Sequence, residues 1–338
     1  MTVTVAAQPE KPEDALLGKS TQLTARDAPS LAMRDLAAAT GLDYPRISKH
    51  CAALGIPTPT WTESVFSEQD LTALIALSEA IDLGTISEAA ELSLVRAISQ
   101  TAQRLAWWQV ETILAEDGSG SNQPLSLLRR LVTLSGFLQD QMLYAWRRHM
   151  SAITRWVTKV GETDLGQTRR ERDALPLAQA VGFADLVGYT EFSGDLSDKQ
   201  LDNMLHEFEW LTQSVVCSHG GRVVKTLGDA ILFIGDQPAN VALAAVELSE
   251  RIGADGRMPK ARLAMCWGRV LPRCGDVFGP TVNLAARLVE MAGPGEVWLD
   301  EPTAIELAER DELSLQALSP VAVEGIGEVM PYRLARQL

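Results

Sequence analysis

The segment from Arg222 to Phe233 constrains the fold more than any other stretch of this chain. Two short apolar runs flank a polar turn that contains Gly228. Because glycine adopts backbone conformations that other residues resist, the pattern predicts a β-hairpin with a tight turn. The turn displays one carboxylate, Asp229, and one ammonium group, Lys225, lies just before it. A carboxylate held beside a strand is a good metal ligand when other ligands join it.

Length and charge limit the classes of function that the rest of the chain can have. With 338 residues, the chain is long enough for two domains, and its 46% hydrophobic content is ample for packed cores. The formal charge of −14 argues against general binding to nucleic acids, which depends on surplus Lys and Arg. ATP remains compatible with this charge, because Mg²⁺ or Mn²⁺ offsets phosphate charge locally.

The chain has the features of a cytoplasmic protein. Its cysteines are scattered and form no CxxC pair, so we expect them to be reduced. The N-terminus lacks the pattern of a signal peptide. We also expect no transmembrane segment, because no apolar run approaches the roughly 18 to 20 residues that span a bilayer.

The first half of the chain has helical periodicity. Residues 1–28 are polar and aperiodic, which predicts a disordered tail. Residues 29–160 predict an all-α domain. Within it, Ser67 and Asp70 are typical of the N-cap of a helix, which we expect to end near Asp82.

Two short helices predicted at 31–40 and 44–54 resemble a helix-turn-helix. One hypothesis is that this segment recognises DNA through Arg46, Lys49 and His50, which would make the chain a DNA-binding regulator. The favoured interpretation is a helix pair that packs on the rest of its domain, because few basic residues flank it and the chain is acidic.

Two longer helices follow. The first begins at Ser87, and Trp107 and Trp108 near its end are interpreted as core aromatics, with a lipid or small-molecule pocket as the alternative. Its apolar positions recur every three or four residues: Ala90, Leu94, Ile98, Ala102 and Leu105. The second helix, over 125–160, has an apolar repeat that is compatible with pairing of two subunits. A charge-rich linker is predicted at 161–176.

From residue 177 the pattern changes to short strands that alternate with helices. The order is β-α-β-β-α-β with additions, which predicts a ferredoxin-like domain of the α+β class over 177–338. Four local motifs stand out in it: Phe183-Ala-Asp185-Leu-Val-Gly-Tyr-Thr190, Lys225-Thr-Leu-Gly-Asp229, Asp276-Val-Phe-Gly279 and Val282-Asn283-Leu-Ala-Ala-Arg287. In this order and at these spacings they resemble the catalytic domain of class III nucleotidyl cyclases, over roughly 177–336.

The resemblance implies a ferredoxin-like βααββαβ fold and an adenylyl cyclase that converts ATP to 3′,5′-cyclic AMP and pyrophosphate. It implies that Asp185 and Asp229, with the backbone carbonyl of Leu186, hold two divalent ions per active site, Mg²⁺ or Mn²⁺. These ions prefer oxygen ligands and activate the ribose 3′-hydroxyl for attack on the α-phosphorus. Asn283 would orient the ribose, and Arg287 would stabilise charge on the α-phosphate in the transition state.

The resemblance also implies a set of substrate-binding residues: Lys225, Asp276, Val187, Gly188, Tyr189 and Thr190. Lys225 and Asp276 would determine which base binds. Adenine offers an acceptor at N1 and a donor at N6, whereas guanine offers the reverse. Lys225 only donates and Asp276 only accepts, so the pair matches adenine. In the Gly-bearing turn after Asp185, backbone N–H groups suit phosphate oxygens.

All of these positions occur in one chain, although the family shares each site between two protomers, which implies a homodimer. The sequence departs from the family at Glu324, where many members have a basic residue that contacts the triphosphate. Either another cation, Arg273 or Arg262, takes that role, or the affinity for ATP depends more on the metal ions. The alternative to an enzyme is a nucleotide-binding signalling module without turnover.

The N-terminal half resembles, more loosely, the regulatory domain of some bacterial class III cyclases. That resemblance implies control of the cyclase by pH and a fatty acid or lipid as ligand. The histidines expected in the connecting segment are absent, since residues 151–180 contain no His. Control of dimer geometry through 125–175 is therefore the regulatory hypothesis.

Overall fold

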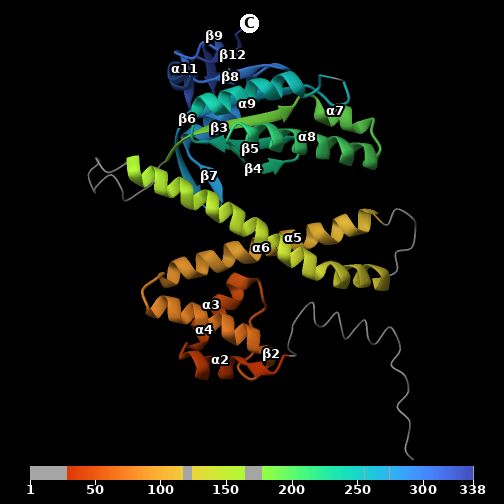
Figure 1. Cartoon of the computed structure of the whole chain (residues 1–338), viewed down its shortest axis with the longest axis vertical. Helices are drawn as coiled ribbons and strands as arrows, with labels where there is room; N and C mark the ends of the chain where they lie inside the picture. Colours follow the sequence, from red (N-terminus) through yellow and green to blue (C-terminus); the bar gives the residue numbers. More distant parts are fainter. Residues whose placement is uncertain (1–28, 117–123, 164–176, 255, 274, 338) are drawn as a thin grey trace, which may run out of the picture. The chain divides into compact units, whose positions relative to one another are not determined.

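The computed structural model describes residues 29–116, 124–163, 177–254, 256–273 and 275–337 (Figure 1). The chain divides into two compact units, Met1–Gly166 and Gln167–Leu338. The predicted tail 1–28, residues 117–123 and residues 164–176 of the predicted linker lie outside the described residues.

The first unit is built mainly from helices, as the periodicity predicts. Its elements are β1 (Leu31–Ala32), α2 (Met33–Thr40), α3 (Tyr44–Leu54), β2 (Ser64–Phe66), α4 (Glu68–Asp82), α5 (Glu88–Glu116) and α6 (Pro124–Thr163). The short antiparallel pair of β1 and β2 was not expected from the helical pattern at Leu31. A small core joins α2, α3 and α4 through Met33, Leu36, Ile47 and Leu74.

The predicted ends of the first two helices and the predicted cap of α4 are confirmed. Gly41 and Gly55 follow α2 and α3 with φ of 74° and 72°, the left-handed conformation in which glycine ends a helix. Ser67 caps α4, and Asp70 returns a hydrogen bond to the Ser67 backbone, which completes a capping box.

The predicted apolar stripe of α5 is wrong. Leu94 and Ile98 are 51% and 66% exposed, and Trp107 and Trp108, interpreted as core aromatics, are 63% and 58% exposed. The helix instead buries a face that contains Glu91 and is held by α3. Apolar periodicity did not predict this buried face, because the face contains an acidic residue.

The DNA hypothesis for the helix-turn-helix-like segment finds no support in the side chains. Arg46 forms ion pairs with Glu91 and, at 2.9 Å, with Glu88. His50 is buried, and its Nδ1 lies 2.9 Å from Glu91 Oε1. Both side chains bind α5, so of the three proposed DNA contacts only Lys49 is exposed. The packing interpretation of this helix pair is the one that the structure supports.

The second unit has the predicted order βααββαβ, followed by additions (Figure 1). The first seven elements are β3 (Leu177–Leu186), α7 (Tyr189–Gly194), α8 (Asp198–Ser218), β4 (Arg222–Leu227), β5 (Ala230–Gly235), α9 (Pro238–Arg251) and β6 (Ala261–Arg273). The additions are β7 (Asp276–Phe278), α10 (Pro280–Met291), β8 (Val297–Leu299), α11 (Glu301–Leu307), β9 (Leu313–Ala317), β10 (Val321–Val323), β11 (Gly327–Val329) and β12 (Tyr332–Arg336).

Eight of these strands form the main sheet, in the order β4-β5-β3-β6-β8-β12-β9 with β7 paired to β6, and β10 and β11 form a separate two-stranded sheet. The first four strands of the main sheet pair antiparallel with one another, as in ferredoxin-like domains, and β8 joins β6 in parallel. The motif at 276–279 begins with β7, because β6 extends to Arg273 and its last residues pair with β7.

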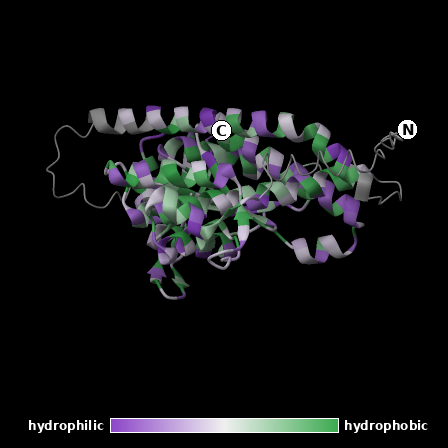
Figure 2. Ribbon diagram, turned by 90° about the horizontal axis from the view of Figure 1, so that it is seen from below, coloured by the Kyte–Doolittle hydropathy of each residue, from purple (hydrophilic) through white to green (hydrophobic). Residues whose placement is uncertain are grey.

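Helices cover both faces of the sheet. Side chains of α8 and α9 pack with Ala180 and Ala184 of β3 on one face. Side chains of α10 pack with Val181 and Phe183 on the other, as the two-residue period of a strand requires. The helices alternate hydrophilic and hydrophobic residues along their length (Figure 2). No helix in the described part of the chain is long and apolar enough to cross a membrane.

Candidate active site

The two predicted metal-binding carboxylates lie next to each other at one end of the sheet. Asp185 is near the end of β3 and pairs in register with Ala230, the first residue of β5. Asp229 occupies the turn before it, where Gly228 has φ of 70°. The Leu186 N–H donates to the Asp229 carbonyl oxygen at 3.1 Å. The hairpin turn is therefore tied to the strand end that carries Asp185.

An arginine lies against Asp185. Arg262 is the register partner of Asp185 on β6, so both side chains project from the same face of the sheet. Its Nε and Nη2 each lie 2.6 Å from Asp185 Oδ2, and its Nη1 donates to the Glu290 carbonyl oxygen at 2.7 Å. The guanidinium thus joins the strand end to the end of α10.

The electrostatics of Asp185 suit a cation. Burial raises the pKa of Asp185 above its ordinary value, and the nearby charges of Asp229 and Glu290 add to this, although Arg262 opposes it. A divalent cation between Asp185 and Asp229 would favour their ionised forms. Two carboxylates and a carbonyl are hard oxygen donors of the kind that Mg²⁺ and Mn²⁺ prefer. The residues therefore fit a divalent ion, although the described residues contain no cluster of three or more His, Cys, Asp or Glu that could hold one.

The turn after Asp185 is only partly available to a ligand. The Val187 N–H donates to the Lys260 carbonyl oxygen at 2.9 Å, so this predicted phosphate contact is already engaged. Gly188 has φ of 70° and precedes α7, whose first residues are Tyr189 and Thr190. The first N–H groups of a helix have no partner within the helix, so those of Tyr189 and Thr190 are better placed than that of Val187.

The two predicted base-reading residues contact each other. Lys225 Nζ on β4 lies 2.5 Å from Asp276 Oδ2 on β7. Burial tends to raise the pKa of Asp276, but hydrogen bonds from Lys225 and from the Val277 N–H, at 2.8 Å from Oδ1, outweigh it and hold that pKa below its ordinary value. A charged donor and a charged acceptor are thus held side by side.

The two predicted catalytic residues are exposed and lie one turn apart on α10. Gly279 precedes this helix with φ of 128°, and Asn283 and Arg287 follow. Arg287 Nη1 lies 3.3 Å from Glu290 Oε2. Since Glu290 also binds Arg262 through its carbonyl oxygen, α10 is connected to the Asp185 end of β3.

Sequence reasoning missed part of this arrangement. It named Arg262 only as a replacement cation, and it named neither Lys260 nor Glu290. Arg262 could have been found by pairing β3 with β6, and Glu290 by its three-residue spacing from Arg287. Glu324, the departure from the family pattern, lies exposed between β10 and β11, next to Gly325 with φ of 75°.

Comparison with known proteins identifies the family. Residues 178–336 match the adenylate and guanylate cyclase catalytic domain. An adenylate cyclase of Glutamicibacter nicotianae is 35% identical over 316 residues, which cover 89% of this chain and 78% of that protein. An adenylate cyclase of Streptomyces coelicolor is 36% identical over 247 residues, which cover 71% of this chain and 62% of that protein.

Among solved structures, the catalytic core of a rhodopsin-guanylyl cyclase with converted specificity, in complex with ATPαS, is 25% identical to this chain. It aligns with a TM-score of 0.43 and covers 47% of this chain and 97% of that core. The sequence matches carry the assignment. The chain therefore belongs to the class III family of adenylate and guanylate cyclases and is an enzyme of that family, with bacterial adenylate cyclases as its relatives over most of its length.

Proposed function

We propose that this chain is an adenylyl cyclase that converts ATP to 3′,5′-cyclic AMP and pyrophosphate. The observation that carries the choice of ATP is the Lys225–Asp276 pair, with Nζ and Oδ2 2.5 Å apart. Lys225 donates to adenine N1 and Asp276 accepts from adenine N6, whereas guanine presents the opposite pattern to both. The names of the bacterial relatives support the same choice.

Asp185, Asp229 and the Leu186 carbonyl would hold two divalent ions, Mg²⁺ or Mn²⁺. When bound, such ions lower the pKa of the ribose 3′-hydroxyl and stabilise negative charge on the reacting phosphate. The chain's own side chains do the rest. Asn283 orients the ribose for in-line attack, and Arg287 stabilises charge on the α-phosphate as the bond to pyrophosphate breaks.

Arg262 takes the role of the basic residue that is absent at Glu324. Its guanidinium already lies at the Asp185 carboxylate, 2.6 Å from Oδ2. The fork of N–H groups on this guanidinium suits phosphate oxygens, so Arg262 would bind the triphosphate if the charge of Asp185 were neutralised by a bound cation. Arg262→Gln should therefore raise the KM for ATP.

The working enzyme is a cytoplasmic homodimer in this proposal. Asp185 and Asp229 come from one protomer, and Lys225, Asp276, Asn283 and Arg287 from its partner, so that two equivalent sites form. The helical domain 29–160 controls the geometry of this dimer through α6 and the segment that follows it. A fatty acid or lipid is the proposed input.

A cyclase assay of the purified full chain tests the proposed reaction. With Mn²⁺ or Mg²⁺ we expect cyclic AMP from ATP, and a kcat/KM for GTP that is lower by about 100-fold or more, because the half-buried Lys225–Asp276 pair would be mismatched to guanine. Nucleotide binding without any cyclic product would favour the alternative of a signalling module. Residues 176–338 assayed alone, with and without fatty acid, then test regulation; identical profiles for the fragment and the full chain would exclude it.

A further inference from the structure

The second half of α6 has an unusual charge for this protein. Residues 141–161 contain four Lys or Arg and no Asp or Glu, in a chain with a formal charge of −14. Each of the described side chains from Gln139 to Arg155 is exposed. This segment is therefore a basic island on an acidic protein.

The same segment carries a continuous apolar stripe. Trp146, Met150 and Ile153 are 59%, 42% and 52% exposed. Their spacing of four and three residues places them on one side of the helix. Leu143, 43% exposed, extends the stripe by one turn toward the N-terminus. Large apolar side chains in a row on a surface mark a site of interaction.

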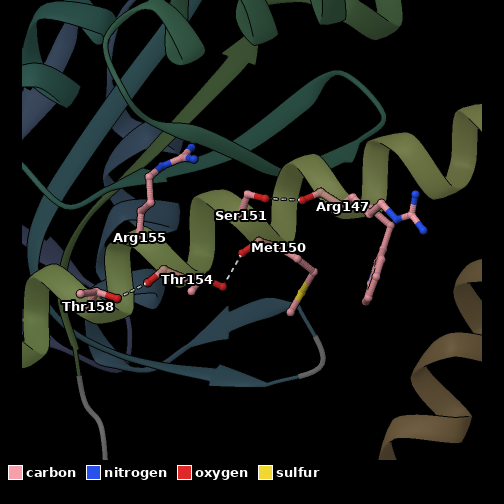
Figure 3. A pocket seen from close by; sticks show the side chains of 7 residues that line it. Arg147, Met150, Ser151, Thr154, Arg155 and Thr158 are labelled. Atoms are coloured by element: carbon pink, nitrogen blue, oxygen red, sulfur yellow. Dashed lines mark hydrogen bonds between the residues drawn. The ribbon is translucent and has the colours of Figure 1, made fainter.

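The arginines lie along the other side of this helix. Figure 3 shows Met150 and Arg155 leaving the helix in different directions. An open pocket lies between the apolar stripe and the arginines. It is lined by Trp146, Arg147, Met150, Ser151, Thr154, Arg155 and Thr158. Its hydroxyl groups are engaged, since Ser151 donates to the Arg147 carbonyl oxygen at 2.9 Å and Thr154 to that of Met150 at 2.8 Å. The polar groups left to meet a ligand are the arginines.

Charge decides which occupant fits this face. A second copy packed on the apolar stripe would leave Arg147, Arg148 and Arg155 on the outer side of the helix, with no carboxylate within 141–161 to pair with them. An anionic lipid surface satisfies both sides of the helix, because apolar side chains enter the acyl boundary while Arg meets lipid phosphate.

We propose that residues 141–161 of α6 bind the surface of an anionic lipid bilayer. The helix lies in the plane of the interface, with Trp146, Met150 and Ile153 toward the acyl chains and Arg147, Arg148 and Arg155 at the headgroups. This function is separate from catalysis and does not depend on the proposed reaction.

The full chain tests the proposal by co-sedimentation with vesicles. We expect binding to vesicles of phosphatidylglycerol and phosphatidylcholine in equal parts, little binding to phosphatidylcholine alone, and weakening with added salt as charges are screened. The double variant R147Q/R155Q should lower the partition coefficient by roughly 30-fold, from about a factor of five per basic residue. Trp146→Ser with Met150→Ser should also lower it by at least about tenfold.

The matched control is R96Q/R104Q, which removes the same charge from exposed positions of α5. It should change the partition coefficient by less than about twofold. Three results would each overturn the proposal. The wild-type protein could fail to bind at low salt, it could bind neutral vesicles equally well, or R96Q/R104Q could lower the partition coefficient as much as R147Q/R155Q. A change from dimer to monomer in Trp146→Ser with Met150→Ser, measured by light scattering without lipid, would also overturn it, because the face would then be a subunit interface.

Discussion

The glycine at position 182 determines how the centre of the second unit packs. Gly182 on β3 is the register partner of Phe233 on β5, whose ring is fully buried. A Cβ at Gly182 would lie 2.3 Å from two ring atoms of Phe233. Neither the strand nor the ring can retreat without disturbing the sheet and the core around it. The glycine is thus required by the close approach of an aromatic ring and not by a turn.

Gly182→Ala should destabilise the protein by about 1 to 3 kcal/mol, because the added methyl group overpacks the core. Urea unfolding would measure the loss, and the double variant with Phe233→Leu should recover part of it by relieving the clash. As a control, Gly136→Ala on α6 adds a methyl group to a helical site with no atom within 4 Å. That change should be neutral or stabilising by up to about 1 kcal/mol. Additive losses in the double variant would contradict the clash.

The residue scale also explains why the contact of Arg262 with Asp185 was not predicted from the sequence. Its role depends on pairing with Asp185, 77 positions earlier in the chain. A motif search reads neighbours along the sequence, whereas register pairs residues across strands. Asp229 and Lys225 could be found together from the sequence, because they lie in one hairpin.

At the scale of elements, a buried polar network holds α11 to the sheet. Asp300 precedes α11, and its carboxylate accepts hydrogen bonds from the Thr303 N–H, at 3.2 Å, and the Thr303 hydroxyl. The same hydroxyl accepts from the Trp267 N–H of β6 at 2.6 Å. Burial raises the pKa of Asp300 above its ordinary value of 3.8, although the bonds from Thr303 oppose this.

The direction of this shift predicts a dependence of stability on pH. A raised pKa in the folded state means that the folded protein holds the proton more tightly than the unfolded chain. The stabilisation from Asp300 is therefore present below its unfolded pKa and is lost as pH rises through its folded pKa. Asp300→Asn keeps the acceptor oxygen and does not titrate, so its stability relative to wild type should increase as pH rises from about 4 through the raised folded-state pKa of Asp300.

Urea unfolding of both proteins across this range would measure the difference. Asp311→Asn, at an exposed position after α11, controls for the loss of one surface carboxylate. A difference between Asp300→Asn and wild type that stays constant with pH, or that falls as pH rises, would contradict the argument.

At the scale of the whole molecule, the proposed shared site makes a prediction that a monomeric site does not. Asp185→Ala and Arg287→Ala should each be inactive alone, because each removes a part that both sites of its homodimer need. Mixed dimers contain one site with both residues intact, so the mixture should regain up to about a quarter of wild-type activity if protomers exchange at random. The measurement is cyclic AMP formation by verified heterodimers. If they recover no activity, the shared-site model is wrong.

Local pattern was sufficient for much of this protein. The hairpin at Gly228, the helix ends at Gly41 and Gly55, the capping box at Ser67 and the alternation of strands and helices from residue 177 were all predicted and confirmed, because each depends on neighbouring residues or on simple periodicity. The full order βααββαβ, with α7 directly before α8, came from the family resemblance. The proposed site residues were identified through motifs of the same local kind, and their roles stay predictions.

Tertiary structure alone decided the rest. It placed Arg262 on Asp185 across β3 and β6, carried β6 on to pair with β7, and turned α5 so that Glu91 is buried while Trp107 and Trp108 are exposed. The physical reason is the same in each case. A contact between distant segments depends on strand register and on which helix face a neighbour covers, and neither quantity is written in the residues close to it along the chain.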